Sequence, residues 1–234
     1  MTPHKAFILA AGMGTRMRPY TDTIPKPLVA VAGHSLIDRT LDHLVEAGIT
    51  DITVNLHYLG KKLEDHLGKR NDVRIRLSYE DELLDTGGGI AKKIAHFGDE
   101  PFFVISGDSL WSDGPDGSAL QKLNEAWDSD KMDILLLLQS TDSMKLTKGI
   151  GDYHLEPDGR AVRSHTQEGT YMFTSIRINK PEIFDGCAQG AFSYLDLMDQ
   201  AQKRGRLFGL VHDGNWHHIS TPEDLDSVNA ALKK

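Results

Sequence analysis

Cysteine is almost absent from this sequence, because Cys187 is the only one in 234 residues. A single cysteine excludes an intrachain disulfide and a cysteine-based zinc cluster. Long hydrophobic runs are also missing, since the apolar stretches at residues 6–11 and 134–138 are far too short for a signal-peptide core or a membrane span. We therefore expect a cytoplasmic protein with no membrane partner.

Positive charge is scarce as well. Lysine and arginine number 26 against 34 acidic residues, which gives a net charge of -8. A protein that binds duplex nucleic acid usually carries a basic face, so we expect no nucleic-acid partner. A phosphorylated ligand stays possible, because a few cations and backbone amides can converge locally in an acidic protein.

Segments with the spacing of strands alternate with segments that have the spacing of helices. The predicted strands and helices are 6–11, 36–47, 52–56, 59–67, 73–77, 89–97, 102–105, 120–127, 134–138, 195–204 and 207–211. Thr221 and Pro222 predict the start of one more helix. The alternation indicates an α/β fold with a doubly wound, mostly parallel (Rossmann-like) mixed sheet. We expect a single domain, 1–234, with halves at about 1–140 and 141–234.

The first predicted strand runs into a glycine-rich turn at residues 12–16, Gly-Met-Gly-Thr-Arg. Two glycines after a buried strand allow a sharp turn and a close approach to a ligand. The free amides of such a turn can bind an anion. A dinucleotide-binding fingerprint is excluded, because no third glycine stands near Met17. A Walker loop is excluded, because Gly-Lys-Ser/Thr is missing.

Lys26 lies between two prolines, Pro25 and Pro27. The prolines restrict the backbone and disfavour a helix, so we expect a stiff, extended segment. A lysine held in this way suits a cation that meets developing charge on a phosphate. On its own, Lys26 fits a surface position in a polyproline-like loop equally well.

Together, Leu-Ala-Ala-Gly-x-Gly-Thr-Arg at 9–16 and Pro-Lys-Pro-Leu at 25–28 resemble the signature of the sugar-1-phosphate nucleotidylyltransferases. The whole chain most resembles the short N-acetylmuramate 1-phosphate uridylyltransferases, followed by the mannose-1-phosphate guanylyltransferases. The resemblance implies nucleotidylyl transfer from a nucleoside triphosphate to a sugar 1-phosphate, with release of pyrophosphate. The implied pair is UTP with N-acetylmuramate 1-phosphate, and the alternative is GTP with mannose 1-phosphate.

The resemblance also assigns roles in the nucleotide-binding half. Arg16 would hold the departing pyrophosphate and Lys26 would stabilise charge at the α-phosphorus, so these are the predicted catalytic residues. Residues 85–89, Asp-Thr-Gly-Gly-Gly, are similar to the family's second glycine motif, and Glu80 stands where relatives contact the base. The predicted nucleotide-binding residues are Leu9, Ala11, Gly12, Met13, Gly14, Thr15, Arg16, Glu80, Gly87 and Gly88.

Asp108 follows a predicted buried strand and resembles the family's Gly-Asp ligand for Mg²⁺. Magnesium prefers a few carboxylates with phosphate oxygens and waters. The family's second ligand is the aspartate of a Trp-x-Asp motif, but here His218 takes its place after Trp216. Imidazole is a poor ligand for a hard cation. Either Asp108 and the triphosphate hold Mg²⁺ with less help, or His218 binds phosphate or another metal.

The second half departs from the family pattern, because the usual Glu-Lys-Pro, whose lysine holds the sugar phosphate, is missing. Arg163 and His165 are the candidates to replace that lysine. Gly151 lies in a segment similar to the acceptor-side glycine turn, and Thr174 in one similar to the strand that faces the sugar. These two are the predicted sugar-phosphate-binding residues.

Two other function classes compete with this interpretation. His218 and the missing Glu-Lys-Pro suggest a non-catalytic regulatory protein that binds nucleotide sugars. A glycosyltransferase would need a metal-binding Asp-x-Asp, which residues 108–110, Asp-Ser-Leu, do not provide. We expect a nucleoside triphosphate and a sugar 1-phosphate as partners, and a monomer or a small homo-oligomer.

Overall fold

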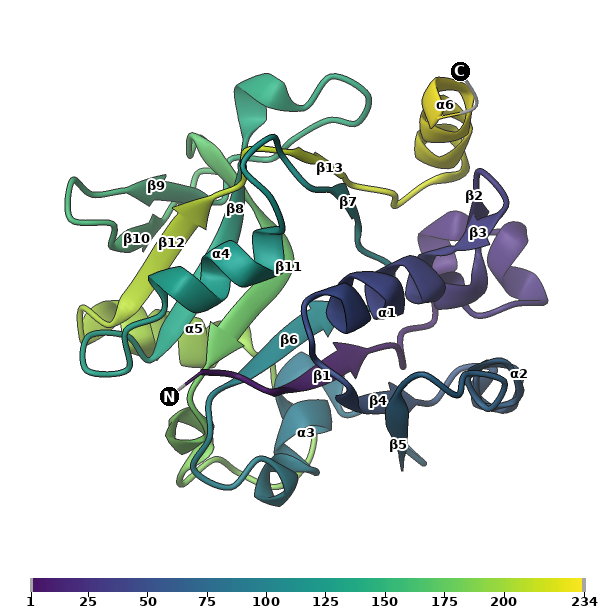
Figure 1. Cartoon of the computed structure of the whole chain (residues 1–234), viewed down its shortest axis with the longest axis horizontal. Helices are drawn as coiled ribbons and strands as arrows, with labels where there is room; N and C mark the ends of the chain where they lie inside the picture. Colours follow the sequence, from purple (N-terminus) through teal and green to yellow (C-terminus); the bar gives the residue numbers. More distant parts are fainter. Residues whose placement is uncertain (1, 233–234) are drawn as a thin grey trace.

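The computed structural model describes residues 2–232 and contains a mixed sheet of nine strands with helices on both faces (Figure 1). Four neighbouring strands are parallel and follow the order β5 (Arg74–Tyr79), β4 (Asp51–Leu56), β1 (Lys5–Leu9) and β6 (Phe102–Ser106). The long strand β11 (Tyr171–Asn179) pairs antiparallel with both β6 and β8 (Ile134–Ser140). Beyond β8 lies β12 (Leu207–Val211), parallel to it.

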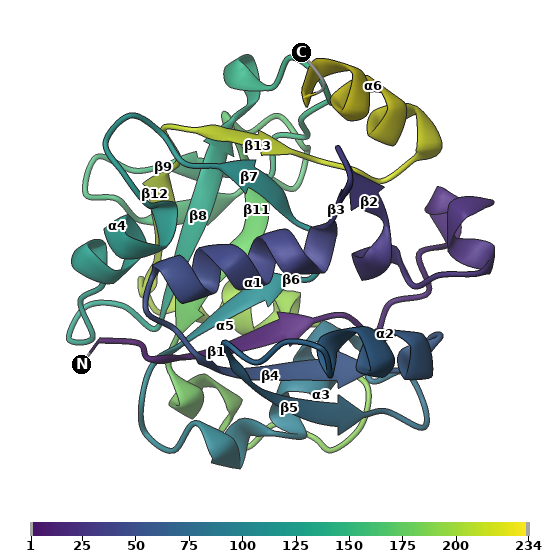
Figure 2. The same cartoon turned by 45° about the vertical axis from the view of Figure 1, so that its right-hand side comes forward.

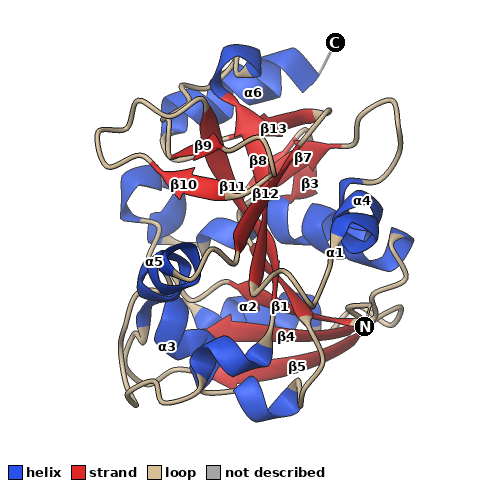
Figure 3. Cartoon of the chain, turned by 90° about the vertical axis from the view of Figure 1, so that its left-hand side faces the viewer, coloured by secondary structure: helices blue, strands red, loops and turns tan. Residues whose placement is uncertain are grey.

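The central strands bury both of their faces. In β6, Phe103 and Ile105 join one hydrophobic cluster, whereas Phe102 and Val104 join another, because successive side chains point to opposite faces. Helices of the first cluster are α1 (Leu36–Glu46), α2 (Gly60–Leu67) and α4 (Ala119–Ala126), and those of the second are α3 (Asp85–Ala91) and α5 (Leu195–Lys203). Figure 3 shows α4 and α5 on opposite sides of the strands. The predicted doubly wound, mostly parallel mixed sheet is confirmed.

Smaller elements complete the upper part of the molecule in Figure 2. They are the pairs β9 (Tyr153–Leu155) with β10 (Ala161–Arg163), β7 (Leu110–Ser112) with β13 (Asn215–His217), and β2 (Ala30–Val31) with β3 (His34–Ser35), and the helix α6 (Pro222–Leu232). A third hydrophobic cluster joins Leu225 and Val228 of α6 to Met17 and Val29. The C-terminal helix therefore braces the loops that follow β1.

Most helix boundaries lie within one or two residues of the predicted ones, and capping side chains mark the starts of α1, α4 and α6. Helix α1 begins after Ser35, whose side chain accepts a hydrogen bond from the Asp38 amide. At the start of α6, the Asp224 amide donates to Thr221 Oγ1 at 3.2 Å, and the Thr221 amide donates to Asp224 Oδ2 at 2.9 Å. Helix α3 differs from the prediction.

The prediction placed a helix at 89–97, beginning at the third glycine, but α3 covers Asp85–Ala91 and contains all three. Glycine has a low helix propensity, which is why the sequence indicated a loop. Close packing outweighs that propensity here. A side chain at Gly87 would meet the ring of Phe192 at 2.3 Å, and one at Gly88 would meet the carbonyl oxygen of Gly190 at 2.1 Å.

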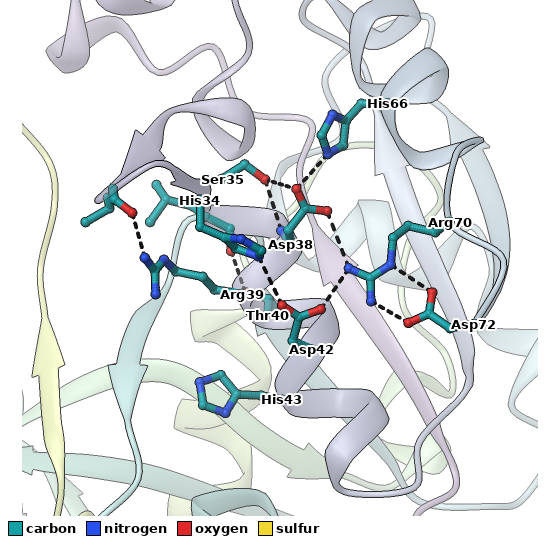
Figure 4. A network of polar contacts seen from close by, with 12 residues as sticks. His34, Ser35, Asp38, Arg39, Thr40, Asp42, His43, His66, Arg70 and Asp72 are labelled. Atoms are coloured by element: carbon teal, nitrogen blue, oxygen red, sulfur yellow. Dashed lines mark hydrogen bonds and ion pairs between the residues drawn. The ribbon is translucent and has the colours of Figure 1, made fainter.

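A polar network connects α1, α2 and the segment after α2 (Figure 4). Asp38 accepts a hydrogen bond from His66 Nε2 at 2.8 Å, and Arg70 contacts Asp38, Asp42 and Asp72. Burial opposes ionisation of Asp38, but hydrogen bonds from Ser35 and His66 and the charges of His66 and Arg70 lower its pKa. Among residues 2–232, no helix has both the length and the apolar composition needed to cross a membrane.

Candidate active site

A cavity of about 600 Å³ lies at the carboxyl ends of β1, β4 and β6. Ligands of open α/β sheets bind at these strand ends. One side, the loop wall, consists of residues 9–12 and 14–17 with Lys26 and Pro27. Another side, the β11–α5 wall, consists of Phe173, Ser175, Arg177, Ser193, Tyr194, Leu195 and Met198. Asn55, Glu80 and Thr86 also line the cavity.

The loop wall presents unpaired donors. Within the described part of the chain, the amides from Ala11 to Thr15 donate no hydrogen bond. Gly14 has a φ of +62°, and space is open around the α-carbon of Gly12. Arg16 lines the cavity without a carboxylate partner among residues 2–232, whereas Arg18 pairs with Asp22 at 3.2 Å. Amides and a free guanidinium form an anion-binding concavity.

Lys26 and Asp108 form an ion pair beside this loop. Lys26 Nζ lies 2.5 Å from Asp108 Oδ2, and Ser106 Oγ donates to Asp108 Oδ1 at 2.5 Å. Burial raises the pKa of Asp108, but the charge of Lys26 and these hydrogen bonds outweigh it and lower the pKa below its usual value. The carboxylate is therefore ionised near neutral pH.

The segment around Lys26 is not extended as predicted. Residues Lys26–Leu28 form a single 3-10 turn, closed by a hydrogen bond from the Val29 amide to the Lys26 carbonyl oxygen at 2.9 Å. Pro27 is compatible with the first turn of a helix because the N–H that it lacks would be unpaired there. A side chain at Gly14 would lie 3.1 Å from Lys26 Cβ, so glycine allows the turn to pack against the loop.

Asn55 and Glu80 fix the ends of three strands. The Ala10 amide donates to Asn55 Oδ1 at 2.7 Å, Asn55 Nδ2 donates to Glu80 Oε1 at 2.7 Å, and the Leu84 amide donates to Glu80 Oε2 at 3.0 Å. Glu80 is 5% exposed. Both carboxylate oxygens are thus engaged within the protein. Contact of Glu80 with a base, as predicted, would use its remaining lone pairs.

Comparison with known proteins agrees with this geometry. A family model described as nucleotidyl transferase matches residues 5–147, more than half of the chain. The chain belongs to the nucleotidyl transferase family. Its matched region includes the loop wall, Lys26, Glu80 and Asp108.

Similar proteins include two curated uridylyltransferases. The chain is 38% identical to an N-acetylmuramate α-1-phosphate uridylyltransferase of Caulobacter vibrioides, over 98% of this chain and 97% of that protein. It is 36% identical to a protein of the same name from Neisseria meningitidis, with 97% of each covered. A solved structure of UDP-glucose pyrophosphorylase with UDP-glucose has the same fold, with a TM-score of 0.79, 21% identity, and coverage of 100% of this chain and 99% of that one.

In this nucleotidyl transferase, most of the predicted nucleotide-binding residues lie together. Leu9, Ala11, Gly12, Gly14, Thr15, Arg16 and Glu80 line the cavity with Lys26 and Asp108. Met13 is 44% exposed and lies outside the lining. Gly87 and Gly88 are buried in α3 and are also outside it, whereas the adjacent Asp85 and Thr86 line it. The structure explains these two glycines by packing, and their contact with a nucleotide stays a prediction.

The predicted acceptor residues do not reach the cavity lining. Thr174 is fully buried and donates from Oγ1 to the Leu137 carbonyl oxygen at 2.8 Å, whereas its neighbours Phe173 and Ser175 line the cavity. The pairing of β11 with β8 is irregular here, between Phe173 and Arg177. Gly151 packs against Gly169, whose carbonyl oxygen a side chain at Gly151 would meet at 2.0 Å.

Arg163 and His165 are not placed to replace the missing lysine in this structure. Arg163 Nη1 donates to Asp199 Oδ2 at 2.9 Å, and its amide donates to Gln202 Oε1. His165 is exposed, and neither side chain lines the cavity. The sequence could not exclude them, because Asp199 and Gln202 are distant in the chain and approach only in the folded protein.

His218 lies within electrostatic reach of the ion pair but outside the cavity lining. Its amide donates to Thr147 Oγ1 at 3.0 Å. Burial lowers the pKa of its imidazole, and the positive charges of Lys26 and Arg16 add to the effect, so the ring is neutral at pH 7. Across residues 2–232, no three His, Cys, Asp or Glu side chains gather into a group that could hold a metal.

Asp108 nevertheless fits a magnesium site that substrate completes. Magnesium is often bound through one or two carboxylates together with substrate phosphates and waters. Asp108 is ionised, lines the cavity and lies beside the unpaired amides that can hold those phosphates. The neutral imidazole of His218 adds no hard oxygen ligand.

Sequence reasoning indicated the strand of the β11–α5 wall but missed Arg177 and the contribution of α5. Arg177 is 3% exposed and lines the cavity, and its guanidinium carbon lies 3.7 Å from the centre of the Tyr194 ring. The signal was present, because Arg177 interrupts an apolar strand between Ile176 and Ile178. A charged residue in a strand that is otherwise buried indicates a partner that the strand itself does not supply.

Proposed function

We propose that this nucleotidyl transferase joins UTP to N-acetylmuramate 1-phosphate and releases pyrophosphate. The observation that carries the proposal is the set of unpaired amides from Ala11 to Thr15, with Arg16 and Lys26 facing the same cavity. These groups suit a triphosphate, because oriented amides and cations converge on one anion. The choice of UTP and N-acetylmuramate 1-phosphate is supported by the full-length similarity to the two uridylyltransferases.

The nucleotide would bind along the loop wall. In our proposal, the amides of Gly12, Gly14 and Thr15 hold triphosphate oxygens, and Arg16 holds the β- and γ-phosphates. Leu9, Ala11 and Glu80 lie on the side where the base and ribose would fit. Met13, Gly87 and Gly88 would act mainly by shaping the loop and by packing α3. Asp108 would hold Mg²⁺, which neutralises phosphate charge when it is bound.

Transfer needs no covalent intermediate with the protein. An oxygen of the sugar phosphate attacks the α-phosphorus of UTP in line, the bond from the α-phosphorus to the bridging oxygen breaks, and pyrophosphate leaves with that oxygen. The attacking phosphate is already ionised near neutral pH, so no general base is required. Lys26 would stabilise the extra negative charge at the α-phosphorus, and Arg16 would hold the departing pyrophosphate.

The acceptor would bind against the β11–α5 wall. We propose that residues 1–140 mainly bind nucleotide and that residues 141–234 mainly bind acceptor, since this wall comes from β11 and α5. Gly151 and Thr174 would support that half through packing. We also propose that the reaction takes place in the cytoplasm, where UTP is available, and that the chain acts as a monomer or a small homo-oligomer.

A pyrophosphate-release assay tests the proposal. The purified protein is assayed with UTP, GTP, dTTP and CTP against N-acetylmuramate, N-acetylglucosamine, glucose and mannose 1-phosphates, with and without Mg²⁺. We expect the highest kcat/KM for UTP with N-acetylmuramate 1-phosphate and no release without the metal. A preference for GTP with mannose 1-phosphate would select the guanylyl alternative. Absence of release in every combination, with nucleotide sugars still bound in calorimetry, would support the non-catalytic alternative.

A further inference from the structure

Arg177 is a buried cation in the middle of the molecule. It lies on β11 opposite Val104 of β6 and Leu136 of β8, and only 3% of its surface is exposed. Its Nε and Nη2 atoms are buried without a hydrogen-bond partner. An arginine carries its charge at any accessible pH, so this charge cannot be removed by loss of a proton.

No acidic side chain compensates that charge. Among residues 2–232, Arg177 forms no ion pair with a carboxylate, whereas the half-buried Arg70, Arg163 and Arg206 each have one, and the half-buried Arg39 donates instead to the Val31 carbonyl oxygen. A buried charge without a partner is costly, and buried charges in proteins are normally paired. The compensating anion is therefore expected to come from a ligand.

The protein holds Arg177 in one orientation. The guanidinium stacks on Tyr194, whose Oη donates to Asn179 Oδ1 at 3.0 Å and whose amide donates to Thr86 Oγ1 at 3.0 Å. Stacking covers the face of the guanidinium and leaves the N–H groups along its edge to bind an anion. A planar fork held in this way matches the two oxygens of a carboxylate.

The triphosphate has other cations within reach. Lys26 and Arg16 lie on the loop wall, whereas Arg177 lies on the β11–α5 wall. Arg177 pairs in register with Val104, two residues before β6 ends at Ser106, so it is about 7 Å further along the sheet from the strand end near Asp108. Arg177 is thus separated along the sheet from the Lys26–Asp108 ion pair.

We propose that Arg177 binds a carboxylate on the acceptor sugar and thereby selects an anionic sugar 1-phosphate. N-acetylmuramate carries such a group in its lactyl ether, whereas N-acetylglucosamine has a free hydroxyl at the same carbon. The inference rests on the proposed transfer reaction and names the residue that distinguishes its acceptor. A neutral acceptor leaves the guanidinium uncompensated, which lowers its affinity relative to the acid.

Product binding tests this assignment without requiring turnover. Calorimetry with UDP-N-acetylmuramate and UDP-N-acetylglucosamine is carried out on the wild type, Arg177→Met and Arg177→Lys, with Arg160→Met as control. Arg160 is an exposed arginine of the same half, paired with Asp158 at 2.8 Å. We expect the wild type and the control to bind the muramate product about 10- to 100-fold more tightly than the glucosamine product.

In Arg177→Met, we expect that preference to fall to within about threefold, with affinity for UDP-N-acetylglucosamine unchanged. Arg177→Lys keeps the charge without the planar fork, so it should retain part of the preference. This variant also provides the test if the methionine variant does not fold. A wild type without preference, or a preference that persists in both variants, would overturn the proposal.

Turnover with the two sugar 1-phosphates separates this inference from the proposed reaction. If uridylyl transfer takes place but Arg177→Met keeps the preference for N-acetylmuramate 1-phosphate, the reaction stands and the role of Arg177 is refuted. If no sugar 1-phosphate is turned over but the preference in product binding depends on Arg177, the reaction is refuted and the carboxylate site stands.

Discussion

Lys26 Nζ and Asp108 Oδ2 lie 2.5 Å apart, so the cation that we assign to the α-phosphate and the carboxylate that we assign to Mg²⁺ are partners of each other. The two residues are 82 positions apart in the chain, and both lie in the matched family region. Substrate binding would exchange this one ion pair for two new ones, between Lys26 and phosphate and between Asp108 and metal. The pair thus keeps both groups charged and positioned before substrate arrives.

Replacement of Lys26 by alanine should lower kcat far more than it raises KM for UTP. The main partner of the ammonium group would be charge that develops in the transition state, so we expect kcat to fall roughly 10²- to 10³-fold and KM to change only about threefold. Steady-state kinetics with saturating acceptor measures both. Arg18→Ala is the control, because Arg18 pairs with Asp22 at the surface, and near-normal kcat in Lys26→Ala would remove Lys26 from the mechanism.

The nucleotide side of the site could be predicted from the sequence because its signals are local. The glycine-rich turn and Lys26 are close in the chain, and a few residues were enough to select both, although the backbone at Lys26 forms a 3-10 turn and not the predicted extended segment. The acceptor side depends on contacts between distant residues. Arg163 is engaged by Asp199, and Thr174 lies where the pairing of β11 with β8 is irregular, between Phe173 and Arg177, so no short motif could place them.

The three glycines of α3 show a second limit of sequence reasoning. Their composition indicated a loop at a ligand, but the structure uses them to let Phe192, Gly190 and the Asn55–Glu80 pair approach the helix. Glycine has the same appearance in a sequence whether the close neighbour is a phosphate or another part of the protein. Only the folded arrangement distinguishes the two.

Substitution of Gly89 by alanine should destabilise the protein, although alanine normally stabilises a helix. The new methyl group would lie 2.7 Å from Glu80 Oε1 and 2.9 Å from Asn55 Nδ2, so it would disturb the pair that fixes the strand ends. We expect a loss of about 1–3 kcal/mol in the free energy of unfolding, measured by urea denaturation, and a higher KM for UTP.

Gly68→Ala provides the matched control for Gly89→Ala. Gly68 follows α2 with a φ of -63°, and a side chain there would meet only the Glu64 carbonyl oxygen, at 3.4 Å. We expect no loss of stability in that variant, since alanine has less conformational freedom to lose on folding. Equal stability of the two variants would contradict the packing explanation for Gly89.

Aspartate at position 218 should reduce the Mg²⁺ concentration needed for half-maximal activity. The neutral imidazole of His218 supplies no hard oxygen, and an added carboxylate near Asp108 would supply one, so we expect a decrease of about 10-fold. A magnesium titration at saturating UTP measures it, with His217→Asp as control. A decrease in kcat without any gain in metal affinity would instead assign the imidazole a role of its own.

The Asp38 network should contribute stability that depends on pH. Because its pKa is lower in the folded protein than in the unfolded chain, its contribution is complete above the unfolded value, about 3.9, and is lost as pH falls through the folded value. We expect Asp38→Asn to reduce the free energy of unfolding by about 1–2 kcal/mol between pH 5 and 7. The more exposed Asp42→Asn should cost less than about 0.5 kcal/mol. A difference that persists undiminished at a pH below the unfolded value would contradict this assignment.

The alternation along β11 also bears on how such an enzyme can diversify. Phe173, Ser175 and Arg177 face the cavity, while the residues between them are buried in the interior. Substitutions at these positions can therefore alter what the acceptor wall accepts, while Ile176 continues to pair with β6 and Ile178 with both β6 and β8. The acceptor preference of such an enzyme can thus change through a few substitutions in one strand, without loss of the sheet that holds the site.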